Sequence, residues 1–177
     1  MSTAQEKQLK KNRHIIACLV DNEFGVLARV VGLFSGRGYN IESLTVTEVD
    51  ESKHLSRITI ITSGSDMVIG QIKALLDRIV PVHKVVDITT QGEHIERELG
   101  LIKVISTGAK RTESLKVADE YGAKVVDSTT DSFVFEITGT SAKVEEFISK
   151  LQPLGLAESC RSGSVAVNRG TEILRIE

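Results

Sequence analysis

Two asparagines and one glycine bracket a single expected helix in the stretch DNEFGVLARVVGLFSGRGYNIESLT, residues 21–45. Asn22 and Gly25 precede the helix, and Asn40 follows it. The first turn of a helix carries unpaired N–H groups and a partial positive charge, which together attract carboxylates. A glycine leaves that backbone open to close approach, and an asparagine amide both donates and accepts hydrogen bonds. These residue types predict a binding site for a small zwitterion.

Apolar residues beside these polar groups could supply the wall of such a pocket. Val26 and Leu27 begin the expected helix, and Ile41 follows the second asparagine. The same pattern has a simpler interpretation, because asparagine and glycine are common in turns, at helix ends and at the entry to strands. The residues alone leave both interpretations open.

Side chains that commonly take part in catalysis are present, but they lack catalytic spacing. Ser35, Ser43 and Ser56 have no G-x-S-x-G context. The string Gly36-Arg37-Gly38 resembles the start of a dinucleotide fingerprint, but it follows a helix instead of a strand. We expect structural or surface roles for the histidines, which show no metal-ligand spacing: His14, His54, His83 and His94. The sequence therefore predicts no catalytic residue and no metal site.

Phe133 and Phe135 lie two residues apart on one expected strand and raise the question of RNA binding. Single-strand RNA readers expose aromatic residues of this kind on a sheet face. The accompanying basic residues are absent, and Glu136 follows directly. We therefore expect the two rings to pack in a small core or at a dimer face.

The elements that must position the asparagines and the glycine follow one simple order. Residues 14–20, HIIACLV, form an apolar run that is typical of a buried strand. The next helix has an apolar stripe at Leu27, Val30, Val31 and Phe34. Further along we expect strands at 40–49 and 55–62, a helix capped by Asp66, and a strand at 82–89. This is the βαββαβ order of ferredoxin-like modules.

The second half of the chain repeats this order. The expected elements are strand 99–107, helix 110–122, strands 123–129 and 132–139, helix 141–151, strand 155–161 and a possible edge strand 163–170. Residues 91–98 are polar and charged, and we interpret them as a linker. The sequence thus predicts an α+β protein with two ferredoxin-like βαββαβ modules, at residues 14–90 and 99–177.

The charge and the cysteine content argue against several classes of protein. The net charge of −2 and the pI of about 6.1 argue against a nucleic-acid partner. Cys18 and Cys160 are far apart, which indicates neither a disulfide framework nor a paired metal motif. No apolar run approaches the ~20 residues of a membrane helix. The N-terminal stretch MSTAQEKQLKKNR is polar, so we expect residues 1–13 to form a flexible tail of a cytoplasmic protein.

Longer strings bear a more specific resemblance. The stretch from Asp21 to Val46, together with LSRITI, EHIERELGLIKV and RSGSVAVNRG, resembles the small, regulatory subunits of acetohydroxyacid synthase, also called acetolactate synthase. The similarity extends from His14 to about Gly170. The combination of RGYNIESL with LSR at this spacing is far more specific than any short motif above.

The resemblance implies a fold and a role. It implies an N-terminal ACT domain, which is an amino-acid-sensing βαββαβ module, and a C-terminal domain particular to this subunit. Members of the family hold no active site and no cofactor. They bind a large catalytic subunit that uses thiamine diphosphate, a divalent metal and FAD to condense two pyruvates, or pyruvate with 2-oxobutyrate. They raise its activity and confer feedback inhibition by a branched-chain amino acid, typically valine.

The resemblance also implies where the effector binds. In such homodimers the effector lies where two ACT domains meet. The corresponding positions here come from the strand-to-helix loop of one protomer and the helix-to-strand junction of the other: Asn22, Phe24, Gly25, Val26 and Leu27, with Asn40 and Ile41. Many relatives have proline or a small residue in place of Phe24, so a phenyl ring here could reshape the pocket.

Two other functions remain open at this point. One is a free-standing ACT-domain amino-acid sensor that acts on another enzyme or on a regulator. The other is an enzyme on a ferredoxin-like scaffold, which the absence of a visible acid–base pair or metal set disfavours.

Overall fold

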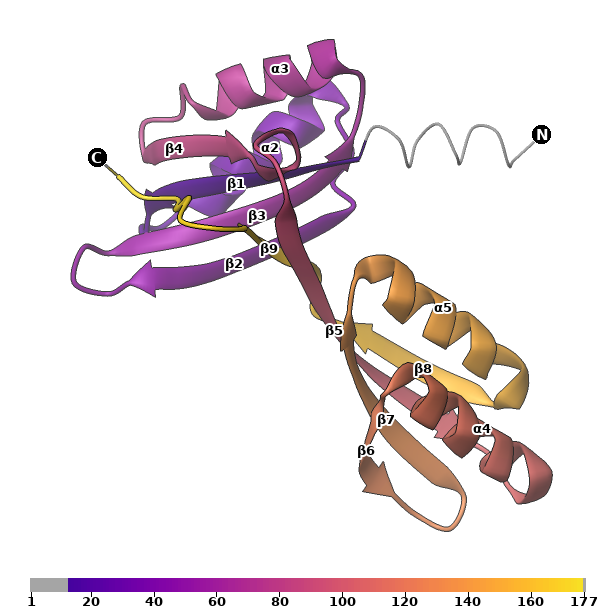
Figure 1. The fold of residues 1–177 in the computed structure, drawn as a ribbon. Helices are drawn as coiled ribbons and strands as arrows, with labels where there is room; N and C mark the ends of the chain where they lie inside the picture. The colour runs from indigo at the N-terminus through magenta and orange to yellow at the C-terminus, as the bar shows by residue number, and fades with distance from the viewer. Residues whose placement is uncertain (1–12, 177) are drawn as a thin grey trace. The chain divides into compact units, whose positions relative to one another are not determined.

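The computed structural model describes residues 13–176, so all but the last residue of the expected N-terminal tail, 1–13, lies outside the described residues. The described chain divides into two compact units, residues 13–95 with 166–176, and residues 96–165. Figure 1 shows that each unit is an antiparallel sheet with its two helices on one face. The prediction of an α+β fold with two βαββαβ modules is confirmed.

The first unit contains a four-stranded sheet with strand order β2-β3-β1-β4. Central strand β1 pairs antiparallel with β3 on one side and with β4 on the other. Its elements are β1 (Arg13–Asp21), α2 (Val26–Arg37), β2 (Ser43–Asp50), β3 (Leu55–Ser63), α3 (Asp66–Leu76), β4 (Val82–Asp87) and a short 3₁₀ helix η1 (Ile88–Thr90).

The second unit repeats this topology, with strand order β6-β7-β5-β8 and β9 added beside β5. Of the two roles expected for Phe133 and Phe135, a small core or a dimer face, the structure shows the core, because both are buried in the cluster under α4 and α5. Its elements are β5 (His94–Ile105), α4 (Gly108–Tyr121), β6 (Lys124–Ser128), β7 (Ser132–Gly139), α5 (Ser141–Leu151), η2 (Gln152–Leu154) and β8 (Leu156–Arg161). Strand β9 (Val165–Asn168) pairs with β5, but all of its residues except Val165 belong to the first unit.

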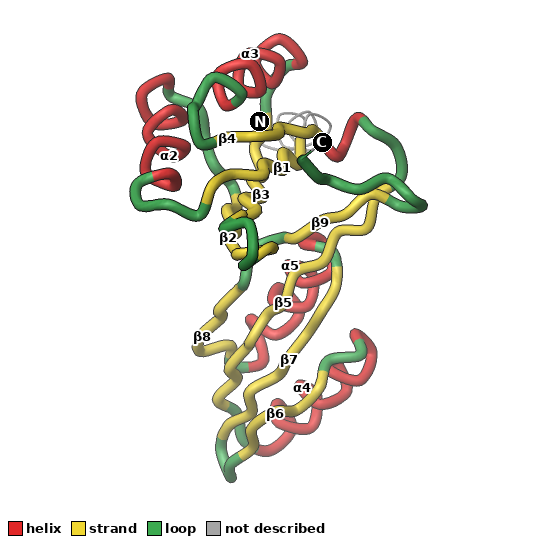
Figure 2. The backbone as a smooth tube through the Cα atoms, turned by 90° about the vertical axis from the view of Figure 1, so that its left-hand side faces the viewer, coloured by secondary structure: helices red, strands yellow, loops and turns green. Residues whose placement is uncertain are grey.

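Both faces of the central strand β1 are buried. Ile16 and Cys18 point from β1 into the core beneath α2 and α3, whereas Ile15 and Ala17 point to the other face. This alternation is the ordinary period of a strand. Ala166 packs on that second face, and Figure 2 shows the C-terminal end and α2 on opposite sides of β1. Coverage of both faces explains the unbroken apolar run of β1.

The structure corrects two expected boundaries of the modules. Residues 94–98, interpreted as part of a linker, are the first part of the long strand β5, and the division between the units falls within that strand. Residues 166–176, expected in the second module, belong to the first unit. In both cases pairing and packing with distant segments override a polar local sequence, which is how tertiary context acts on strands.

The buried stripe of α2 also differs from the predicted one. Val26, Val30 and Phe34 are buried, whereas Leu27 is 41% exposed and Val31 is only half-buried. Val30 and Phe34 are buried as predicted, but Val26 takes the place of Leu27 because the helix begins at Val26, whose side chain lies in the core.

Candidate functional site

The loop between β1 and α2 is held at its base by backbone hydrogen bonds. The N–H of Asp21 donates to the carbonyl of Pro81 at 2.8 Å, and the N–H of Asn22 donates to the carbonyl of His54 at 2.6 Å. These bonds leave the Asn22 side chain exposed at the start of the loop. They anchor the four residues that lead into α2 to the neighbouring turns.

Gly25 turns the chain into α2 through a left-handed conformation, with φ 85° and ψ −5°. Residues with a side chain rarely adopt this conformation, so the backbone geometry favours a glycine here. A Cβ placed on Gly25 would meet no atom of residues 13–176 within 4 Å. The space in front of the helix is therefore open.

The first turn of α2 lacks the features that usually neutralise a helix N-terminus. Gly25 occupies the N-cap position without a side-chain hydrogen bond, and the first turn contains no acidic residue. Glu23 is close by, but its carboxylate pairs with Arg29 at 3.5 Å. The uncapped N–H groups and the helix dipole thus provide a backbone site suited to a carboxylate.

The apolar residues around this helix start contribute unequally. Phe24 is fully exposed, at 102% of its reference area, and Leu27 is 41% exposed, so both present apolar surface beside the opening. Val26 was expected to form part of the apolar wall, but its side chain is 3% exposed and lies in the core. Only its backbone faces the opening, because α2 places this residue on its buried stripe.

Asn40 and Ile41 lie at the other end of α2. Gly38 ends the helix in a left-handed conformation, with φ 71°. Asn40 is exposed, and its backbone carbonyl accepts a hydrogen bond from Thr62 Oγ1 at 2.6 Å. Asn40 was expected to open the strand, but β2 begins three residues later, at Ser43. Ile41 is partly buried against the core of the first unit.

Within one chain the two groups of candidate residues are separated by the length of α2. A helix of 12 residues spans about 18 Å, so one protomer does not bring Asn22 and Asn40 to the same small ligand. The structure of a single chain therefore gathers Asn22, Phe24, Gly25 and Leu27 at one end, and Asn40 and Ile41 at the other.

Other reactive side chains in the described chain have structural surroundings. His14 Nδ1 is 2.8 Å from Oδ2 of the buried Asp87. His83 Nε2 is 2.6 Å from Oδ1 of Asp21. Burial raises the pKa of the Cys18 thiol to about 12, which keeps it protonated and unreactive. Across residues 13–176 no three metal-ligating side chains gather in one place. No helix in this range is long and apolar enough to span a membrane.

Sequence reasoning did not single out two polar groups that the structure brings together. Glu98, buried in the second unit, accepts hydrogen bonds from Arg161 at 2.6 and 2.9 Å and from Ser141 at 2.8 Å. Arg57 and Asn168, in the first unit, line a cavity under the C-terminal segment. Each group joins residues more than 40 positions apart in the chain, so no local motif could have indicated it.

Comparison with known proteins assigns both units. Residues 16–84 match the family model described as the AHAS small subunit-like ACT domain. Residues 97–170 match the model described as the small subunit of acetolactate synthase. The two matches cover most of the first sheet and nearly all of the second unit.

Whole-length relatives agree with these matches. The acetolactate synthase small subunit of Haemophilus influenzae is 45% identical over 159 residues, covering 89% of this chain and 96% of the relative. That of Aquifex aeolicus is 42% identical, covering 96% of this chain and 89% of the relative. The crystal structure of the acetolactate synthase small subunit from Thermotoga maritima superimposes with a TM-score of 0.81 at 37% identity, covering 90% of this chain and 99% of that one. The resemblance noted in the sequence is thus confirmed, and the chain belongs to the acetolactate synthase small subunit family.

Proposed function

We propose that this chain is the regulatory subunit of an acetolactate synthase, in which it activates the catalytic large subunit and confers feedback inhibition by a branched-chain amino acid, most simply valine. The observation that carries the proposal is the similarity of the chain, along nearly its whole length, to small subunits of this enzyme. The uncapped helix start at Gly25 supplies a place for the effector in the ACT unit.

In the proposed site the effector carboxylate accepts hydrogen bonds from the backbone N–H groups at the start of α2. The exposed amide of Asn22 meets the ammonium or carboxylate group. Phe24 and Leu27, both exposed, contact the aliphatic side chain of the effector. Binding through backbone donors is favourable because the helix dipole and the hydrogen bonds act on the same charge.

The proposed effector site needs two copies of the chain. Asn40 and Ile41 of a second protomer complete it, since α2 separates them from Gly25 within one protomer. Strand β2 follows these two residues and forms an edge of the first sheet. Two of its apolar residues, Val46 and Val49, are about half exposed. An edge strand with exposed apolar residues is a natural pairing surface for another chain, so we propose homodimerisation through the ACT units.

Catalysis belongs to the partner in this proposal. Thiamine diphosphate, the divalent metal and FAD are held by the large subunit, and this chain supplies no reacting group. Without the large subunit, we expect the chain to make no acetolactate from pyruvate, whether in the cytoplasm or as the purified protein.

The deciding experiment is a titration of the chain into its large subunit while acetolactate is measured. We expect the rate to rise severalfold on saturation, and to fall again when valine is added. Leucine and isoleucine, tested in parallel, identify the preferred effector. If the chain neither co-purifies with the large subunit nor changes its rate, the alternative of a free-standing ACT sensor replaces the proposal.

A further inference from the structure

The C-terminal segment, residues 166–176, covers part of the first sheet and leaves a cavity beneath it. Ala166 is buried against Ile15 and Val86, and Leu174 packs at the edge of the same cluster. The cavity has a volume of about 640 Å³, and every residue that lines it belongs to the first unit. This volume is within the range of small-molecule sites, roughly 300–1,000 Å³. It lies on the face of the sheet opposite α2, away from the proposed effector site.

The cavity has a basic character. Arg57, Lys84 and Arg175 line it, and Glu172 is the one acidic side chain among its lining residues. The chain as a whole has a net charge of −2. A local excess of positive charge in an acidic protein favours an anionic ligand.

Arg57 is held in place by a hydrogen bond to the C-terminal segment. Its Nη2 donates to the carbonyl of Ala166 at 2.6 Å, which ties β3 to the C-terminal segment. The side chain is half-buried, and burial lowers the pKa of Arg57. A carboxylate in the cavity would offset this desolvation, because guanidinium and carboxylate form strong paired hydrogen bonds.

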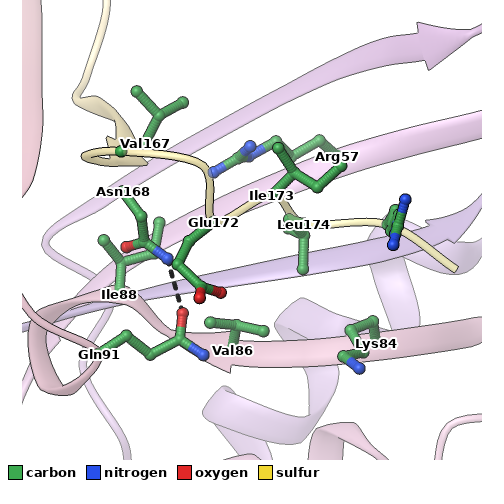
Figure 3. Close-up of a pocket in the computed structure, with 12 residues that line it drawn as sticks. Arg57, Lys84, Val86, Ile88, Gln91, Val167, Asn168, Glu172, Ile173 and Leu174 are labelled. Carbon is green, nitrogen blue, oxygen red and sulfur yellow. Dashed lines mark hydrogen bonds between the residues drawn. The ribbon is translucent and has the colours of Figure 1, made fainter. Parts of the chain in front are cut away.

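A buried acceptor in the cavity lacks a donor. Asn168 Nδ2 donates to Gln91 Oε1 at 2.7 Å. The other atom of the amide, Asn168 Oδ1, is buried and has no hydrogen-bond partner in the described part of the chain. Figure 3 shows the Glu172 carboxylate near this amide. Unsatisfied buried acceptors are unfavourable, so this end of the cavity suits a hydroxyl or ammonium group.

The floor between these polar groups is apolar. Val86 lies two residues after Lys84 on β4, so both side chains share one face of the strand. Ile88 packs in the same apolar cluster as Val86. Figure 3 shows Leu174 pointing toward Val86 from the C-terminal segment. An aliphatic group of a few carbons would contact these side chains.

We propose that this cavity binds a small aliphatic carboxylic acid that carries a hydroxyl or ammonium donor. Arg57 and Arg175 hold the carboxylate, Asn168 Oδ1 accepts from the donor, and Val86 and Leu174 contact the aliphatic chain. The site is complete within one protomer. It is therefore a second ligand site, independent of the dimer-dependent site at Gly25.

The test locates binding directly by NMR of the methyl groups in the full chain. The probes are 2-hydroxy-3-methylbutanoate, valine and 3-methylbutanoate, which keep the carboxylate and the branched chain but differ in the donor. We expect saturable shifts of the Ile88 and Leu174 methyl signals, both in the natural chain and in Gly25→Asp. The acid without a donor should bind at least about tenfold more weakly, since one buried hydrogen bond is lost. The tighter of the other two probes identifies the source of the ligand, a hydroxy acid or an amino acid.

Two variants sharpen the test. Arg175→Gln and Asn168→Leu should each weaken binding of the tighter probe about tenfold or more. Lys103→Gln, a change at an exposed lysine in the second unit, is the matched control and should leave the affinity unchanged. If Asn168→Leu does not fold, Arg175→Gln and the donor-free acid still decide. Shifts confined to Leu27 and absent in Gly25→Asp would overturn the proposal, as would Ile88 shifts that Arg175→Gln leaves unaltered.

Discussion

The two units share one topology, yet they enter their first helices differently. Four residues, 22–25, connect β1 to α2, and the helix start is uncapped and open. Only two residues, 106–107, connect β5 to α4. Lys110 and Arg111 then follow in the first turn of α4, where positive charge opposes the helix dipole.

Arg111 has a structural role in the second unit. Its guanidinium carbon is 3.8 Å from the centroid of the Phe133 ring, and its Nη1 donates to the carbonyl of Ser132. The difference between the units shows that the βαββαβ topology alone does not create a ligand site. Both helix starts lack a side-chain cap, so the charged and apolar residues around each start decide whether it suits an anionic ligand, in keeping with the rule that function resides in sites on a fold.

The largest expected effect comes from Gly25→Asp, which places a carboxylate at the uncapped start of α2. The new carboxylate occupies the place proposed for that of the effector and repels it. Asp tolerates the left-handed conformation better than most residues and gains about 0.3–1 kcal/mol from the helix dipole. Loss of two charge-assisted hydrogen bonds, at ~1.5–3 kcal/mol each, weakens effector binding roughly a hundredfold or more. The measurement is the rate of the reconstituted synthase against valine concentration.

Gly108→Asp is the matched control for this prediction. Gly108 also has a left-handed φ, 57°, and a Cβ there would meet no atom of residues 13–176 within 4 Å. We expect the Gly108 variant to remain sensitive to valine. Equal sensitivity of the natural enzyme and a folded Gly25→Asp variant would place the effector site elsewhere.

The second prediction concerns stability in the second unit, where Glu98 is only 4% exposed. Replacing Glu98 by Gln should lower the free energy of unfolding by about 2 kcal/mol, because it weakens hydrogen bonds to a charged group. Glu158→Gln is the control. Glu158 pairs with Lys103 at 3.4 Å on the surface, so its loss should matter by less than about 1 kcal/mol. Urea unfolding at neutral pH measures both, and equal effects would contradict the structural role of Glu98.

The same carboxylate predicts a pH dependence. Burial acts to raise the pKa of Glu98, but hydrogen bonds from Arg161 and Ser141 outweigh it and hold the pKa below the ordinary value of 4.5. A lowered pKa in the folded state stabilises the fold above pH 4.5, and this contribution is lost as the pH falls through the folded-state pKa. The gap in stability between the natural chain and Glu98→Gln should therefore narrow below pH 4.5. A gap that widens on acidification would be inconsistent with this assignment.

A smaller effect is expected at the far end of α2. Asn40→Ala removes the amide that, in our proposal, the second protomer offers to the effector, and it should weaken inhibition by valine about tenfold. The turn should survive, because Thr62 bonds the backbone carbonyl of Asn40 and not its side chain. Activation of the large subunit, measured in the same titration, should be unchanged. An unaltered inhibition curve would show that the second protomer does not use this amide.

The smallest expected effect is at Phe24, the exposed ring beside the uncapped helix start. Phe24→Ala should raise the valine concentration for half-inhibition by about threefold, since a partly covered apolar contact contributes less than 1 kcal/mol. Val126→Ala, at an exposed apolar residue of β6, serves as the control and should have no effect. A large gain in affinity on removing the ring would show that Phe24 obstructs the site.

Much of this architecture was fixed by local sequence. The order of strands and helices follows from apolar periodicities of two and 3.6 residues, and Gly25 and Gly38 mark the ends of α2 because both take left-handed conformations there. The candidate loop could therefore be identified before the fold was known. These features depend on residues a few positions apart, whose conformational preferences act within one element.

Tertiary structure alone decided the remainder. The polar residues 94–98 became a strand because β5 pairs with distant partners. Val26 replaced Leu27 on the buried side of α2 because the core closes over the helix start. The C-terminal segment covers the first sheet because Ala166 and Leu174 find apolar partners there. Contacts with the C-terminal segment join residues as far apart in sequence as Arg57 and Ala166. Their stabilising effect depends on which segments meet in the folded protein, and no local sequence pattern shows this.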